Sequence, residues 1–346
     1  MKIVIAALFL TIPLFWSKTF GHHGQVGAPI LYKADDLVIL EGELIDIFWR
    51  FPHVRFGLSV QTNDAEETVW ELEWGIPNVL EGQGITTDFF QVGDPIKAAG
   101  HIALRDDRSL GLLHLLLPNG QEFAPRGRAL LWSSERVQTI EQEYDPSEVE
   151  AAKQTAKGLF RVWSSTKLPT QVDAAHNFDH LLTPVGQQAL AAWDPVKHPV
   201  LECVPRGMPA RMLAGPIEFL DGGEQITIKS IWWGGQRIIH LESEDAPAGA
   251  EHTRLGYSKG SWDGDALVVE TTHVDWPYFD RRGTPQSDQM EFVERFEMSA
   301  DETRMEYILT GTDPVAFTEP VTVKTDWVWT PGREVYTSDC VLWDGK

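Results

Sequence analysis

The chain has 346 residues but only two cysteines, Cys203 and Cys340. Two thiols are too few for a disulfide-based scaffold or for a zinc site built from thiolates. In an oxidising compartment they could form a disulfide that ties the start of a second domain to its last strand. Two separate buried thiols are the alternative, and the sequence leaves both open.

Basic side chains are also scarce. The 29 lysines and arginines stand against 51 aspartates and glutamates, which gives a formal net charge of −22. Such a negative field repels phosphate backbones and anionic membrane surfaces, and it attracts cations. We therefore expect a small molecule or a metal ion as the partner, and no nucleic acid.

Long apolar runs are missing beyond the first residues, so we expect no stable insertion into a membrane. Ile3 to Trp16 is apolar, follows Lys2 and is short for a bilayer span, and small residues then stand where a signal peptidase cuts. This pattern predicts a signal peptide over residues 1–21, a mature chain that starts at His22, and a periplasmic or secreted protein. An uncleaved N-terminal anchor is the alternative.

Several catalytic motifs are absent as well. The sequence has no Gly-x-Ser-x-Gly elbow, no dinucleotide-binding fingerprint and no EF-hand loop. Gly256, Gly260 and Gly264 are too widely spaced for a phosphate-binding loop. Whether the chain is an enzyme therefore stays open at this level.

What the sequence does contain is alternation of apolar and polar residues with a period of two, which is the pattern of half-buried strands. Residues 55–60 and 69–74 alternate strictly, and turn signals separate further short apolar runs up to residue 121. About five or six strands in this length predict a small β-barrel of the OB type, or a sandwich. We assign it to residues 22–125.

The rest of the chain divides into a connector and a larger domain. Ser147 and Glu150 form a capping-box pattern, which predicts a helix in a connector over residues 126–165. Over residues 166–346, a short helix follows Thr183-Pro184. Strand patterns come after it at residues 225–231, 237–241, 266–272, 290–298, 304–310 and 321–329. The chain is thus predicted to be mainly β, with the small barrel followed by a larger antiparallel β-barrel or sandwich and a few short helices.

The first domain carries a series of short motifs, which are His22-His23-Gly24, residues 40–44, Phe51-Pro52-His53, Trp70-Glu71-Leu72-Glu73 and Gly93-Asp94. In this order they resemble an uncharacterised family of small exported proteobacterial proteins. Those proteins have a mature Ala-His-His-Ser start, a Gly-x-Val strand, an Asn-Pro-His turn and a Trp-x-x-Glu strand. Here Gly24 replaces the serine and Phe51 the asparagine. The resemblance implies export and carries over no activity.

The second domain has its own motifs, which are Leu182-Thr183-Pro184 with Gly186, Asp194-Pro195, residues 203–209, residues 256–272, Glu294-Arg295-Phe296 and Asp313-Pro314. These stretches resemble hypothetical exported bacterial proteins of unknown function. The resemblance implies export and a layout of two domains, and it leaves the chemistry open.

The mature N-terminus offers nitrogen ligands for a metal. Cleavage after Gly21 gives His22 a free α-amine beside its imidazole, and His23 and His53 add two more imidazoles. A tetragonal set of nitrogen ligands suits Cu(II), so the sequence predicts copper as the bound metal. A solvated terminus without a metal is the alternative.

His176 and His180 form a weaker second candidate for a metal site. Because the two residues are four positions apart, they would share one face of a helix. Asn177 and Asp179 instead suit an exposed polar loop, which is the alternative.

The catalytic candidates are three carboxylates and an arginine near the predicted strand at residues 266–272. Glu270, Asp275, Glu294 and Arg295 would place carboxylates beside a cation, an arrangement that can serve acid–base chemistry. A structural salt bridge is the alternative.

These patterns together favour a periplasmic protein that handles a metal, copper, or binds a small ligand. The alternative is an enzyme of the hydratase, lyase or hydrolase type. It would bind an apolar, ring-containing substrate in the second domain and act through groups such as Glu270. The 14 tryptophans fit either a packed core or the wall of such a pocket.

Overall fold

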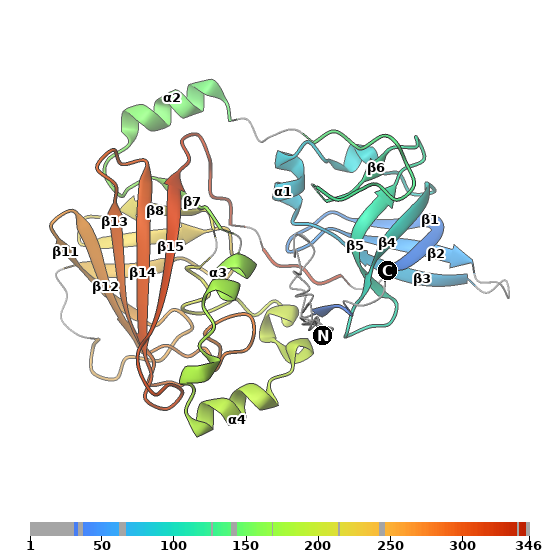
Figure 1. Cartoon of the computed structure of the whole chain (residues 1–346). Coiled ribbons are helices and arrows are strands. Elements are labelled where there is room, and N and C mark those ends of the chain that lie inside the picture. Colours follow the sequence, from blue (N-terminus) through green and yellow to red (C-terminus); the bar gives the residue numbers. More distant parts are fainter. Residues whose placement is uncertain are drawn as a thin grey trace, which may run out of the picture.

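The computed structural model describes residues 31–33, 37–61, 67–125, 127–139, 144–167, 169–213, 215–241, 246–337 and 339–343. This part of the chain forms a smaller and a larger β-barrel, joined by a connector with one helix (Figure 1). The fold is mainly β, as predicted. Within the described ranges, no helix has the length and apolar character needed to cross a membrane.

The smaller barrel is built from the first strands of the chain. They are β1 (Val38–Phe48), β2 (Arg55–Gln61), β3 (Glu67–Glu73), β4 (Pro95–Ile102), β5 (Ser109–Leu116) and the short β6 (Glu122–Phe123). Antiparallel pairing gives the order β3-β2-β1-β4-β5, and parallel pairing of β3 with β5 closes the ring. This five-stranded closed order is of the OB type, which confirms the predicted small barrel.

The period of two in the sequence explains why β2 and β3 form one side of the smaller barrel. Phe56, Leu58 and Leu72 alternate with polar residues and are fully buried in the core of the smaller barrel. The polar residues between them therefore lie on the outer face. Helix α1 (Pro77–Gly82) and the 3₁₀ turn η2 (Thr87–Phe89) fill the connection between β3 and β4.

The connector begins beside a buried carboxylate. Glu122 accepts hydrogen bonds from the backbone N–H groups of Leu131 at 2.9 Å, Trp132 at 2.9 Å and Ser133 at 3.1 Å. These bonds fold the chain after β6 back onto the barrel. Helix α2 (Pro146–Thr155) follows. Its N-cap is Asp145, whose side chain accepts from the N–H of Ser147, and not Ser147 as the capping-box pattern predicted, because Pro146 already occupies the first helical position.

The larger barrel closes with nine strands. They are β7 (Val162–Ser165), β8 (Ile217–Asp221), β9 (Gln225–Ser230), β10 (Arg237–Leu241), β11 (Tyr257–Asp263), β12 (Ala266–Thr272), β13 (Glu291–Met298), β14 (Arg304–Thr312) and β15 (Val321–Trp329). Neighbours are antiparallel except for β10 and β11, which are parallel. The predicted larger β-barrel is confirmed. Strand β7 falls inside the stretch assigned to the connector, yet it pairs with β8 and β15.

Short helical segments lie between β7 and β8. They are α3 (Pro169–Ala175), η3 (Asp179–Leu181), α4 (Pro184–Ala192), η4 (Pro195–Lys197) and η5 (Pro199–Glu202). As the sequence predicted, Thr183 caps α4, because its hydroxyl accepts from the N–H of Gly186 at 3.1 Å. Figure 1 shows α4 towards one end of the larger barrel and α2 towards the other.

The chain after β15 returns to the smaller barrel (Figure 1). Cys340 in this segment forms a disulfide with Cys203, which follows η5. The second cysteine therefore lies in a tail beyond the last strand, and not in that strand as expected. The N–H of Val341 donates to the carbonyl of Phe51 at 3.0 Å, and the indole of Trp343 donates to Asp46 at 2.8 Å. The tail thus contacts both barrels.

Candidate functional site

A cluster of polar side chains lies on the outer face of the smaller barrel. The β2–β3 polar cluster consists of Tyr32, His53, Arg55, Glu71 and Glu73. Its place follows from strand register, because Arg55 is paired with Glu73 and Gly57 with Glu71 across β2 and β3. Side chains at alternate positions share one face of a sheet, so these polar groups meet there.

Arg55 bridges the two carboxylates of this cluster. Its Nε lies 2.8 Å from Oε1 of Glu71, and its Nη2 lies 3.2 Å from Oε2 of Glu73. The three side chains are only 10–15% exposed, so water screens these ion pairs poorly. The hydroxyl of Tyr32 also hydrogen-bonds to Glu73.

The two carboxylates differ in their proton affinity. Burial raises the pKa of Glu71, and the charge of Arg55 offsets this only in part. Burial would also raise the pKa of Glu73, but His53, Arg55 and the Tyr32 hydrogen bond together bring it below its usual value. Burial and the charge of Glu73 raise the pKa of Tyr32 well above its usual value. Neighbouring acids with pKa values displaced in opposite directions are a common mark of a functional site.

His53 is the nitrogen ligand that this cluster holds in place. Its Nδ1 lies 3.0 Å from the carbonyl oxygen of Trp74 and 3.8 Å from Oε1 of Glu73. Because a carbonyl oxygen only accepts, Nδ1 donates to it, and in the neutral form of the ring the lone pair is on Nε2. The side chain is 27% exposed. An imidazole whose second nitrogen donates to a carbonyl is the usual state of a metal-ligating histidine.

The other predicted nitrogen ligands at this site, His22 and His23, lie outside the residues that the structure describes. Among the described residues, no three His, Cys, Asp or Glu side chains are grouped so that they could hold a metal ion. A site of several nitrogens at His53 therefore needs donors from another part of the chain.

The weaker pair, His176 and His180, does not share a helix. Helix α3 ends at Ala175 and His180 lies in η3, so the two histidines do not share one helical face as predicted. Nδ1 of His176 donates to the carbonyl of Val172 at 2.8 Å, and its Nε2 accepts from the N–H of Lys324 at 3.3 Å. A metal on His176 would have to displace one of these bonds.

The four catalytic candidates are not brought together. Glu294 points into the larger barrel and is fully buried, whereas Glu270, on the outer face of β12, lies 3.0 Å from Lys259. Arg295 is also on the outer face, where it pairs with Asp263 at 2.7 Å, and Asp275 is exposed after β12. Glu294 does form a salt bridge, but with Arg237 and not with the predicted Arg295.

That salt bridge belongs to a buried network inside the larger barrel. Arg237 pairs with Glu294, with one N–O distance of 2.9 Å, and the hydroxyl of Tyr307 donates to the same carboxylate at 2.6 Å. Ser258 and Thr271 complete the network, because their hydroxyl oxygens accept hydrogen bonds from Arg237 at 3.1 and 2.7 Å. Each residue comes from a different strand between β10 and β14, so the network ties five neighbouring strands together.

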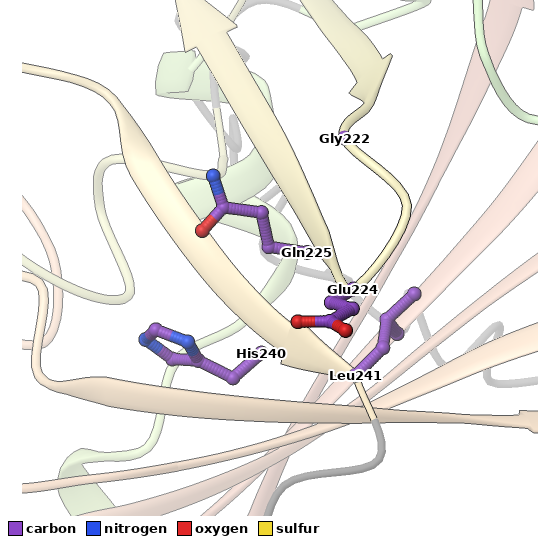
Figure 2. A pocket seen from close by; sticks show the side chains of 5 residues that line it. All are labelled: Gly222, Glu224, Gln225, His240 and Leu241. Carbon is purple, nitrogen blue, oxygen red and sulfur yellow. The ribbon is translucent and has the colours of Figure 1, made fainter.

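A surface hollow of about 450 Å³ lies beside the start of β9 and the end of β10 in the larger barrel. Its lining residues are Gly222, Glu224, Gln225, His240 and Leu241. Figure 2 shows that these residues come from β9, β10 and the turn before β9. The ring of His240 stacks on Tyr257 with ring centres 4.9 Å apart. The hollow offers one carboxylate and one imidazole, which is a sparse set for binding a metal or for catalysis.

Sequence reasoning selected His53 but did not assign a role to its neighbours. Glu71 and Glu73 alternate with apolar residues, which was enough to place them on an outer face. Arg55 and Tyr32 join them only through strand pairing and packing against β5, where the Tyr32 ring fills the space over Gly111. The available signal was the charge pattern of two strands that follow each other in the sequence.

Comparison with known proteins adds one finding. Residues 16–113 match the model of a family of unknown function (DUF6152). The matched stretch spans His22, His23, His53 and both carboxylates of the β2–β3 polar cluster. No curated protein and no solved structure matches the chain significantly. The resemblance predicted for the first domain is therefore confirmed in its coarse form, a similarity to an uncharacterised family.

Proposed function

We propose that this chain is an exported copper-binding protein, with His53 as a fixed ligand on the smaller barrel and with His22 and His23 as the remaining donors. The observation that carries the proposal is the geometry of His53. Its Nδ1 is committed to the Trp74 carbonyl, with Glu73 close by, and this orients Nε2 as the ligand atom.

Charge and family similarity support the same assignment. The net charge of −22 attracts cations, and Glu71 and Glu73 place two carboxylates against a single arginine next to His53. One family match spans all three histidines, which supports treating them as one unit. The disulfide between Cys203 and Cys340 supports export, because such bonds persist in oxidising compartments.

The donor set depends on signal cleavage after Gly21. Only then does His22 carry a free α-amine, which in an unperturbed chain titrates at roughly pH 7.7–8.0. Copper competes with protons for this amine and for the imidazoles, so copper affinity should fall as the pH is lowered. Imidazole and amine nitrogens together suit Cu(II).

The first test compares two N-termini of the mature protein without an affinity tag. One form begins at His22, and the other carries a single additional glycine before it. We expect the first form to bind about one equivalent of Cu(II), and the second to bind it at least about tenfold more weakly, because the amine is no longer at His22. Calorimetry gives the affinity, and electron paramagnetic resonance reports the number of nitrogen ligands.

A second comparison tests His53 itself. His53→Gln removes the imidazole and should weaken Cu(II) binding by at least about tenfold. His180→Gln is the matched control, because it removes an exposed histidine of the other candidate pair, and it should bind copper as the unmodified protein does. Equal binding by both N-terminal forms, or weaker binding by His180→Gln alone, contradicts the proposal.

A further inference from the structure

The segment from Cys203 to Pro209 holds an arginine in a rigid loop beside the larger barrel. Gly207 has no room for a side chain, because a Cβ there would lie 2.5 Å from the Cβ of Trp276. The N–H of Met208 donates to the carbonyl of Arg254 at 2.9 Å, and its carbonyl accepts from Gln286 at 2.8 Å. The backbone on the C-terminal side of Arg206 is therefore fixed.

In the described part of the chain, Arg206 has no anion of its own. Its guanidinium lies over the ring of Trp232, 5.6 Å from the ring centre, and its buried Nε has no hydrogen-bond partner there. The charged groups that affect it are Asp173 and Arg281. Asp173 already accepts from Nε of Arg281 at 2.8 Å. Within the described ranges, no acceptor is hydrogen-bonded to Arg206.

The neighbouring polar atoms that have no partner in the described structure are mostly donors, the exception being the acceptor Oε1 of Gln286. The indole nitrogens of Trp232 and Trp276 are buried without a hydrogen-bond partner in the described structure, and Trp276 is only 4% exposed. Nδ1 of His198 accepts from the N–H of Val200 at 3.2 Å, so the neutral ring carries its proton on Nε2, a further donor. Buried donors without acceptors are rare in folded proteins and call for a partner.

This excess of donors specifies the chemistry of the missing partner. A ligand group that only accepts hydrogen bonds would pair with these donors. A carboxylate is such a group, and its two oxygens match the planar fork of a guanidinium. A phosphate would bring more negative charge than Arg206 alone balances, because Arg281 is already paired with Asp173.

Further aromatic rings lie beside the loop that holds the arginine, since Trp276 packs against Gly207. The ring of His198 stacks on Tyr278 with centres 5.0 Å apart and meets the edge of Trp276 at 5.8 Å. Trp232 and Tyr278 are only half-buried, so parts of their rings stay uncovered. Uncovered aromatic faces beside a cation suit a flat, ring-bearing anion.

We propose that Arg206, Trp232 and Trp276 form a binding site for a small aromatic carboxylate, with the carboxylate on Arg206 and the ring against Trp232 and Tyr278. The site belongs to the larger barrel and does not depend on copper binding by the smaller one. It gives the second domain a ligand of defined chemistry.

The binding test uses benzoate with the metal-free mature protein, followed by calorimetry and by tryptophan fluorescence. Three comparison ligands lack features of benzoate: benzamide lacks the charge, acetate lacks the ring, and sulfate lacks both the ring and the flat shape. We expect benzoate to bind at least about tenfold more tightly than each of the three. Absence of benzoate binding, or sulfate binding as tight as benzoate binding, overturns the proposal.

Variants locate the site. Arg206→Gln should weaken benzoate binding at least about tenfold, and Arg206→Lys should weaken it less, because lysine keeps the charge without the planar fork. Arg282→Gln is the matched control, since Arg282 is already paired with Asp179 at 3.2 Å and Asp280 at 3.3 Å, and it should change the affinity by less than about twofold. If Arg206→Gln does not fold, Arg206→Lys decides. Unchanged affinity in a folded Arg206 variant refutes the site.

Discussion

His198 illustrates how much a single side chain can contribute to the pH dependence of this fold. Burial, and next the nearby charge of Arg206, lower its pKa from 6.5 to about 4. In the unfolded chain the ring takes up a proton near pH 6.5, whereas in the folded chain it stays neutral down to about pH 4. Above this pH window, the burial of the ring does not reduce the free energy of unfolding. As the pH falls through the window, the unfolded chain takes up a proton that the folded chain does not, and the free energy of unfolding decreases. The full loss corresponds to about 3 kcal/mol.

The variant that isolates this effect is His198→Asn. Asparagine offers an acceptor for the N–H of Val200 but does not titrate. Between about pH 7 and about pH 5, the free energy of unfolding of the unmodified protein should fall by about 2 kcal/mol more than that of His198→Asn. Urea unfolding at the two pH values measures this difference. Equal losses in both proteins would show that His198 is not the titrating group.

At the scale of residues, the sequence pointed to individual side chains better than to the groups that surround them. His53 stands out because a Pro-His turn precedes a strand pattern, and the structure places it at a polar cluster. Arg206 did not stand out, because its lack of a partner depends on Asp173 and Arg281, which are distant in the sequence. The absence of an acceptor cannot be read from local pattern.

At the scale of elements, the network around Glu294 joins the strands of the larger barrel. Glu294→Gln leaves Arg237 buried without its counter-charge, and breaking a buried ion pair in this way destabilises a protein by about 3–5 kcal/mol. We expect a decrease of this size in the free energy of unfolding, measured by urea denaturation. Glu270→Gln is the control on the outer face of β12 and should change stability by about 0.5 kcal/mol or less. Similar small effects of both substitutions would contradict the role given to the network.

Strands were predictable where one face is apolar. The sequence pattern indicated β9, β10 and β12 to β15, whose buried positions alternate with exposed or half-buried ones. It did not indicate β11, because the inner face of that strand carries Ser258 and Gly260 and no large apolar side chain. Gly260 is needed there, since a Cβ would lie 2.6 Å from Ile239 on β10. Because β11 packs closely against the parallel strand β10, it lacks the alternation of apolar and polar residues on which a strand prediction depends.

At the scale of the whole molecule, the two barrels are linked twice. The connector with α2 is one link, and the tail after β15 is the other (Figure 1). Phe51 of the smaller barrel meets Trp233 of the larger one, with ring centres 5.5 Å apart, close to the disulfide, because the Trp233 indole donates to the carbonyl of Cys203. Two separate barrels followed from periodicity. The tail was not predictable, because residues 339–343 carry no period and the contacts described for them join residues that are far apart in the sequence.

The disulfide should therefore hold the barrels together as well as stabilise the larger one. It joins residues that are 137 positions apart, and closing a loop of this length constrains the unfolded chain by up to about 5 kcal/mol. In the double variant Cys203→Ser, Cys340→Ser, we expect a lower unfolding midpoint and faster proteolytic cleavage of the tail, because Val341 and Trp343 lose their covalent support. Trp343→Phe, with the disulfide intact, is the control that removes only the hydrogen bond to Asp46. If the double variant resists cleavage as well as this control does, the non-covalent contacts alone hold the tail, and the disulfide acts only within the larger domain.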